Sequence, residues 1–66
     1  MPTALSIRPG YWRVTTPDGR VLGNIEAVGS DGGSEYRANR FRPSVLGYAP
    51  LGSFNDLAVA IDAFRN

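Results

Sequence analysis

The chain alternates between short segments rich in aromatic and β-branched residues and segments rich in glycine and proline. The apolar-rich segments are Tyr11–Thr16 (YWRVTT), Arg20–Val28 (RVLGNIEAV) and Glu35–Arg42 (EYRANRFR). Their composition and length are typical of β-strands. Pro17-Asp18-Gly19 separates the first two segments, and this triplet supplies the fixed φ, the side-chain acceptor and the positive φ of a tight turn. The pattern predicts antiparallel strands joined by hairpins.

The segments between these strands carry their own signals. Gly23, inside the second strand, indicates a bulge or a close approach of another backbone. The loop Gly29–Ser34 (GSDGGS) leads to the third strand, which Pro43 ends. Gly47–Leu51 forms a short fourth strand or an edge, because Pro50 is tolerated only at an edge.

Near the C-terminus the apolar spacing changes to the period of a helix. Ser53 is the expected N-cap, and Asp56 three residues later gives an acidic version of the capping box. The residues that share one helix face are Phe54, Leu57, Ala58, Ile61 and Phe64. The fold class is therefore α+β: a three-stranded antiparallel sheet, or a four-stranded one, packed on a single C-terminal helix.

The chain has 66 residues, which is one small domain. Residues 1–9, which include Pro2 and Pro9, are expected to form an N-terminal tail, and residues 10–66 the domain. The domain buries only about 60% of the surface of its unfolded chain, so a homodimer would be a natural way to bury more. No segment has the run of about 20 apolar residues of a membrane span, and we expect a cytoplasmic protein without a membrane partner.

The sequence excludes most catalytic and metal chemistry. It contains no Cys and no His, which removes disulfides, nucleophilic triads and nearly all zinc or haem arrangements. The carboxylates do not repeat at a spacing suited to a metal or to acid–base catalysis. We therefore expect no enzyme activity, no catalytic residue, no metal and no cofactor.

Strand alternation assigns the side chains to two faces of the sheet. The face expected to meet the helix carries Trp12, Val14, Val21, Ile25, Ala27, Tyr36 and Ala38. The other face carries Tyr11, Arg13, Thr15, Leu22, Asn24, Glu26, Arg37, Asn39 and Phe41. A bulge in the third strand would exchange Arg37 and Asn39 for Arg40 and Arg42. The plainest interpretation of the second face is a solvated surface with weak cross-strand pairs.

All seven basic residues are arginines, although the net charge is only +1. The planar guanidinium group can bond bidentately to phosphates, carboxylates and base edges. A GC-rich genome gives the same bias toward Arg, so the bias alone does not indicate a nucleic-acid partner.

Two segments resemble known DNA-binding domains. Leu51–Asp62 (LGSFNDLAVAID) resembles the helix entry of the plant ethylene-response-factor domain and of the arm-type domain of tyrosine recombinases, and Glu35–Arg42 is similar to their central strand. The resemblance implies a sheet that enters the DNA major groove, with Arg37 and Asn39 as contacts and Arg13 or Arg20 beside them. The chain departs from these families by its acids Glu26 and Glu35 and by the lack of a dense basic first strand.

Two functions remain open from the sequence. The first is a small DNA-binding domain or accessory protein that uses its exposed sheet face on duplex DNA. The alternative is a non-catalytic interaction or regulatory module, of the kind that phages and plasmids encode, with Tyr11, Leu22 and Phe41 as apolar anchors for a protein partner at the sheet face or edge. The candidate binding residues are Arg13, Arg37, Asn39, Arg40, Phe41 and Arg42.

Overall fold

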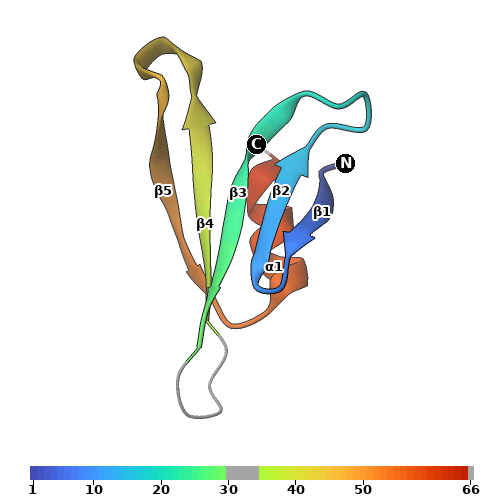
Figure 1. Cartoon of the computed structure of the whole chain (residues 1–66), viewed down its shortest axis with the longest axis vertical. Helices are drawn as coiled ribbons and strands as arrows, with labels where there is room; N and C mark the ends of the chain where they lie inside the picture. Colours follow the sequence, from blue (N-terminus) through green and yellow to red (C-terminus); the bar gives the residue numbers. More distant parts are fainter. Residues whose placement is uncertain (30–34, 66) are drawn as a thin grey trace.

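The computed structural model describes residues 1–29 and 35–65, so most of the predicted loop Gly29–Ser34 lies outside the described residues. One antiparallel sheet of five strands follows the order of the chain, and a short helix comes after it (Figure 1). The strands are β1 (Thr3–Arg8), β2 (Tyr11–Thr15), β3 (Val21–Val28), β4 (Glu35–Arg42) and β5 (Gly47–Phe54). The helical elements are the 3-10 turn η1 (Pro43–Val45), the helix α1 (Leu57–Asp62) and the 3-10 turn η2 (Ala63–Arg65).

The α+β class, the antiparallel sheet and the C-terminal helix are confirmed, but the sheet has five strands instead of three or four. One additional strand, β1, lies in the segment expected to be a tail. Pro2 precedes this strand and Pro9 follows it, so the two prolines bound the strand without interrupting it. Gly10, with φ of 80°, completes the turn into β2. The other difference is β5, which extends past the predicted Gly47–Leu51 to Phe54.

The turn between β2 and β3 has the predicted chemistry. Gly19 adopts φ of 97°, and its amide donates to the carbonyl of Thr16 over 2.9 Å. The Thr16 hydroxyl donates to the Asp18 carboxylate, and this hydrogen bond holds the pKa of Asp18 below its ordinary value of 3.8. The Asp18 carboxylate in this exposed turn is therefore ionised at neutral pH.

A bulge between β2 and β3 corrects two face assignments. Val14 pairs with Gly23 but Thr15 pairs with Val21, so Leu22 is the additional residue. Leu22, predicted on the exposed sheet face, packs against the core, whereas Val21, predicted in the core, is exposed. A one-residue shift moves each following side chain to the opposite face, which explains both errors.

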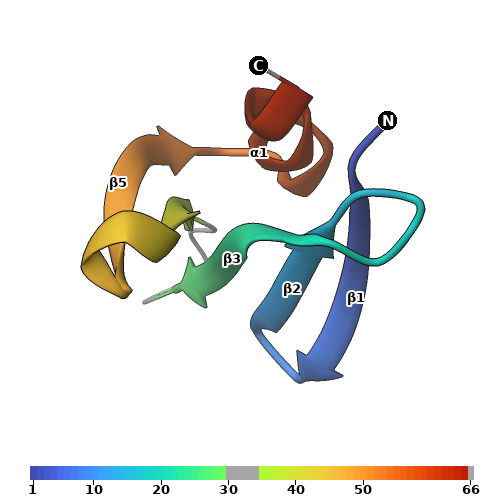
Figure 2. The ribbon, with the colours of Figure 1, turned by 90° about the horizontal axis from the view of Figure 1, so that it is seen from above.

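The core lies between the sheet and α1, which sits within the curve of the sheet (Figure 2). The buried hydrophobic residues are Val14, Ile25, Ala38, Ala60 and Phe64. The half-buried residues packed around them are Trp12, Leu22, Tyr36, Phe54, Leu57 and Ile61. The rings of Trp12 and Tyr36 meet edge to face at 5.8 Å between centroids. Most of the predicted helix face is therefore in the core.

The helix begins later than predicted. Ser53 lies in β5, and the N-cap is Asp56, whose carboxylate accepts from the Ala58 amide over 2.7 Å. The reason is that β5 still pairs with β4 at Phe54, opposite Tyr36, so the chain stays extended past Ser53. The later start also changes the buried helix face, because Ala60 is buried and Ala58 is exposed.

Gly23 has the close backbone approach that its position in the strand predicted. A Cβ atom there would lie 2.0 Å from the carbonyl oxygen of Asn39 and 2.7 Å from Cε1 of Phe64. Only a glycine leaves room for β4 and for the ring of Phe64 at this point, so Gly23 sets how closely η2 packs on the sheet.

Candidate nucleic-acid interface on the open sheet face

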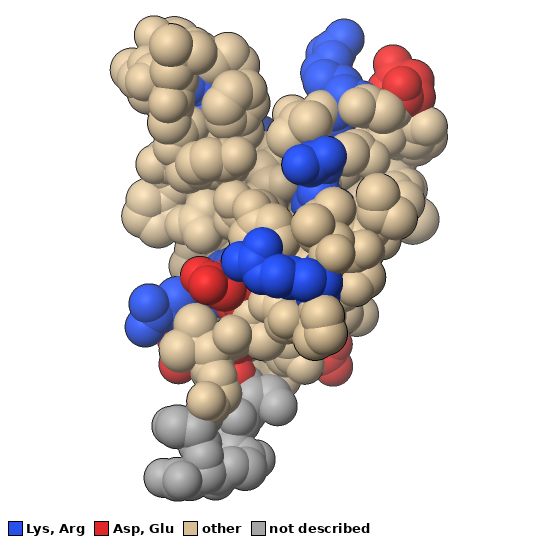
Figure 3. Space-filling view, viewed as in Figure 1, with Lys and Arg blue, Asp and Glu red and all other residues tan. Residues whose placement is uncertain are grey.

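The sheet face that points away from α1, called here the open face, carries two rows of side chains that cross all five strands. Residues opposite each other in adjacent antiparallel strands share a face, which defines the rows from the register. The first row is Arg8, Tyr11, Glu26, Arg37 and Ser53, and the second is Leu5, Arg13, Asn24, Asn39 and Pro50. Since α1 lies behind the sheet in Figure 1, the same view in Figure 3 shows the open face, with arginines spread across it and acids among them.

The first row combines a stacked arginine with a weak ion pair. The Arg8 guanidinium lies 4.5 Å from the centroid of the Tyr11 ring, a cation–π contact that holds the group over the sheet. Arg37 Nε lies 3.5 Å from Oε2 of Glu35, and both side chains are largely exposed. An ion pair of this kind contributes at most about 1 kcal/mol, so the Arg37 guanidinium can exchange Glu35 for another anion.

The second row has a fixed pair of amides at its centre. Asn39 Nδ2 donates to Asn24 Oδ1 over 3.1 Å in a half-buried position. Each amide keeps donor or acceptor capacity for another molecule, because a side-chain amide has two donors and a two-lone-pair oxygen. Arg13, opposite Asn24 in the register, is exposed beside them. The row therefore presents a guanidinium next to two oriented amides.

Apolar residues gather at the end of the β4–β5 hairpin. The rings of Phe41 and Tyr48 lie 5.5 Å apart. Val45 and Leu46 in the connection are exposed, Leu46 to 86%, and Leu46 adopts φ of 49°. These four residues are called the hairpin tip.

The six predicted binding residues are divided between the two faces. Arg13, Arg37, Asn39 and Phe41 lie on the open face, since the β3–β4 register runs without a shift from Glu35 to Arg40. Arg40 pairs with Gly23 and therefore points to the helix side, and alternation places Arg42 on the same side. The β3–β4 pairing lacks the bulge that would have moved these two arginines to the open face. The candidate interface thus contains four of the six.

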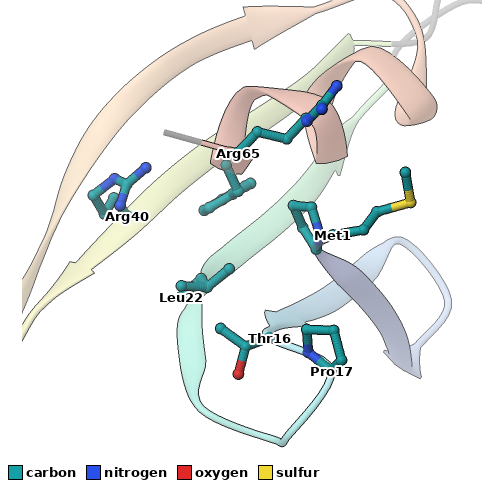
Figure 4. A pocket seen from close by; sticks show the side chains of 8 residues that line it. Met1, Thr16, Pro17, Leu22, Arg40 and Arg65 are labelled. Carbon is teal, nitrogen blue, oxygen red and sulfur yellow. The ribbon is translucent and has the colours of Figure 1, made fainter.

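On the helix side, Arg40 borders a shallow hollow between Leu22, Phe64 and the first residues of the chain (Figure 4). Arg65 also borders the hollow, but Figure 4 shows its side chain directed along the helix, where Nη1 bonds Oδ1 of Asp62 at 3.2 Å. The hollow is open to solvent and mostly apolar in its lining, which suits packing better than chemistry.

Arg8 is the arginine of the open face that sequence reasoning missed. Pro2 and Pro9 predict a tail for the residues between them, and Arg8 is one of these residues. In TALSIR, Leu5 and Ile7 alternate with the small residues Ala4 and Ser6, a pattern that indicates a strand. That strand places Arg8 opposite Tyr11.

Among the described residues no group of three or more His, Cys, Asp or Glu side chains could hold a metal ion. Within the same residues, no helix has the length and apolar character needed to cross a membrane. No protein-family model matches the sequence, and no curated protein or solved structure matches the chain. The resemblance to the two families of DNA-binding domains stays a prediction, and the functional argument rests on the open face.

Proposed function

We propose that the protein binds duplex DNA through its open face. The observation that carries this proposal is the placement of Arg8, Arg13 and Arg37 on one sheet face around the bonded pair Asn24–Asn39. Arginine and asparagine are the side chains that bond guanine and adenine edges bidentately in the major groove. Arginines that miss a base edge still reach phosphate oxygens, which fix the position of a protein on the duplex.

The shape of the sheet supports the same partner. The sheet curves around α1, so the open face is its convex side (Figure 2). The major groove, about 12 Å wide, admits a β-ribbon. The two rows lie on adjacent positions across β2, β3 and β4, so a groove that receives these strands would meet the arginines and the amides together.

The charge of the chain sets the expected strength of binding. Its net charge is +1, and Glu26 and Glu35 lie near Arg37. Three arginines would neutralise about three phosphates, which gives a slope of log affinity against log salt of about −2.7. Binding would therefore be weak at physiological salt unless base contacts or avidity add to it.

A titration of labelled duplex DNA, followed by fluorescence anisotropy at two salt concentrations, tests the proposal. Arg37→Ala should weaken binding and reduce the salt slope by about 0.9, the contribution of one phosphate. Arg65→Ala is the matched control, because its side chain is 60% exposed against 59% for Arg37 and each is paired with one acid. An equal loss for the two variants, or no binding at low salt, would contradict the proposal.

The hairpin tip favours a second candidate function, a contact with a protein partner. Exposed Leu46, Val45 and Tyr48 next to Phe41 form an apolar surface of the kind that anchors interfaces. This candidate predicts little dependence on salt and a large loss of partner binding for Phe41→Ala. In the DNA titration, Leu46→Ala should leave the affinity unchanged, and a larger loss for Leu46→Ala than for Arg37→Ala would favour the tip over the open face.

A further inference from the structure

The two edges of the sheet differ in how they are protected. The β5 edge carries Pro50, which has no amide hydrogen, a register shift next to it and Gly52 with φ of 145°. These are the devices that prevent a strand edge from pairing with another chain. Strand β1, at the opposite edge (Figure 1), is TALSIR, with no proline and no charge before Arg8. Within the part of the chain that the structure describes, β1 pairs with no strand other than β2, so its other side offers a row of backbone donors and acceptors.

Two of the exposed side chains of β1 are large and apolar, although strand edges are often protected by charged side chains. Leu5 is 59% exposed and Ile7 is also exposed. Leu5 pairs with Arg13 and lies on the open face, whereas Ile7 is at the register shift between Ser6 and Arg8. Burial of these two side chains requires another surface beside β1.

We propose that this surface is β1 of a second copy of the chain, paired antiparallel about Leu5. A continued sheet requires that opposite residues share a face, so a two-fold axis can pass only through a residue position. Axes at Leu5 and at Ser6 each pair five residues of β1, and the axis at Leu5 leaves Arg8, which ends the register shift, outside the paired stretch. This axis sets Leu5 opposite Leu5, Ala4 opposite Ser6 and Thr3 opposite Ile7. Ala4 and Ser6 face the helix side, Leu5 meets Leu5 on the open face, and Arg8 is not opposite another charge. The strand is self-complementary in this register.

The dimer would join two five-stranded sheets into one, with both helices on the same side. The two Arg13 residues would then lie on strands separated by three strand spacings, about 14 Å, across a centre of leucines. The proposed dimer does not depend on what the open face binds. If DNA is the partner, the dimer would present two copies of the open face on one continuous sheet.

Sedimentation at increasing protein concentration tests the proposal. A stable interface buries about 1,000 Å² or more, and one strand pair buries less than this. We therefore expect a weak dimer, which forms at protein concentrations between about 10 μM and 1 mM. Leu5→Lys puts like charges opposite each other and should abolish the dimer. Val59→Lys is the matched control, because Val59 is exposed to 53%, on α1, and it should dimerise like the unmodified protein. A protein that stays monomeric, a dimer that survives Leu5→Lys, or one that both variants abolish would overturn the proposal.

A crosslinking experiment tests the same pairing without Leu5→Lys, a variant whose effect could come from a change in folding. The chain has no cysteine, so Leu5→Cys introduces a single thiol. Opposite residues in an antiparallel pair have Cα atoms about 4.5–5.5 Å apart, within the range of a disulfide. Mild oxidation should convert most of Leu5→Cys into a covalent dimer and little of Val59→Cys. Equal yields for the two variants would show that the pairing is not centred on Leu5.

Discussion

Gly23 shows how a single residue determines the packing in this fold. Gly23→Ala would place a methyl group 2.0 Å from the Asn39 carbonyl and 2.7 Å from the Phe64 ring, so the backbone of β4 or η2 must move. We expect a loss of about 1–3 kcal/mol in the free energy of unfolding, the usual cost of overpacking. Urea denaturation measures this loss, which is a large fraction of the stability of a domain of this size.

The control for this prediction is another strand glycine, Gly47. A Cβ atom on Gly47 meets nothing closer than 3.7 Å. Gly47→Ala should therefore be neutral or gain up to about 1 kcal/mol through the unfolded chain. If Gly23→Ala were as stable as Gly47→Ala, the close approach between β3, β4 and Phe64 would be wrong.

At this scale the sequence predicted faces well wherever pairing is regular. Arg37 and Asn39 lie on the open face as alternation predicted, because β3 and β4 pair without a shift. Val21 and Leu22 exchanged faces because one additional residue enters β3 opposite Thr15. Gly23 indicated a bulge or a close approach of another backbone. It did not indicate which neighbouring strand makes the approach, because that depends on strand pairing and not on the local sequence.

Among the elements, α1 depends on its cap because it has only six residues. The Asp56 carboxylate accepts from the Ala58 amide, so Asp56→Ala should lower the free energy of unfolding by about 0.5–2 kcal/mol. Ser53→Ala, inside β5, should change it little. Thermal denaturation of the two variants compares them, and a greater loss for Ser53→Ala would place the start of the helix at Ser53 instead.

The boundaries of elements were harder to predict than their types. Ser53 and Asp56 are both good capping residues, and the choice between them depends on the pairing of Phe54 with Tyr36, which only the sheet reveals. Pro2 and Pro9 favour a tail, whereas the alternation between them favours strand β1, and the structure has the strand. Strand β1 joins the sheet by pairing with β2 across a turn. The sequence of residues 1–9 alone does not specify this pairing.

For the molecule as a whole, the open face and the hairpin tip point to different partners. The open face holds three arginines and two oriented amides, whereas the tip holds exposed apolar side chains. The sequence indicated the polar and the apolar candidate residues, but it did not indicate that they lie in different parts of the molecule. It also counted Arg40 and Arg42 with the binding residues, and the register places them on the helix side.

The measurement that tests the central claim most directly is an NMR titration of the isotope-labelled protein with a short DNA duplex at low salt. The side-chain Nε signals of Arg8, Arg13 and Arg37 and the amide groups of Asn24 and Asn39 should shift together as DNA is added. The Nε signal of Arg65 and the signals of α1 should stay in place, since they lie on the other side of the sheet. Shifts confined to the hairpin tip or to the helix side, or no shifts at all, would contradict the assignment of the open face as a DNA-binding surface.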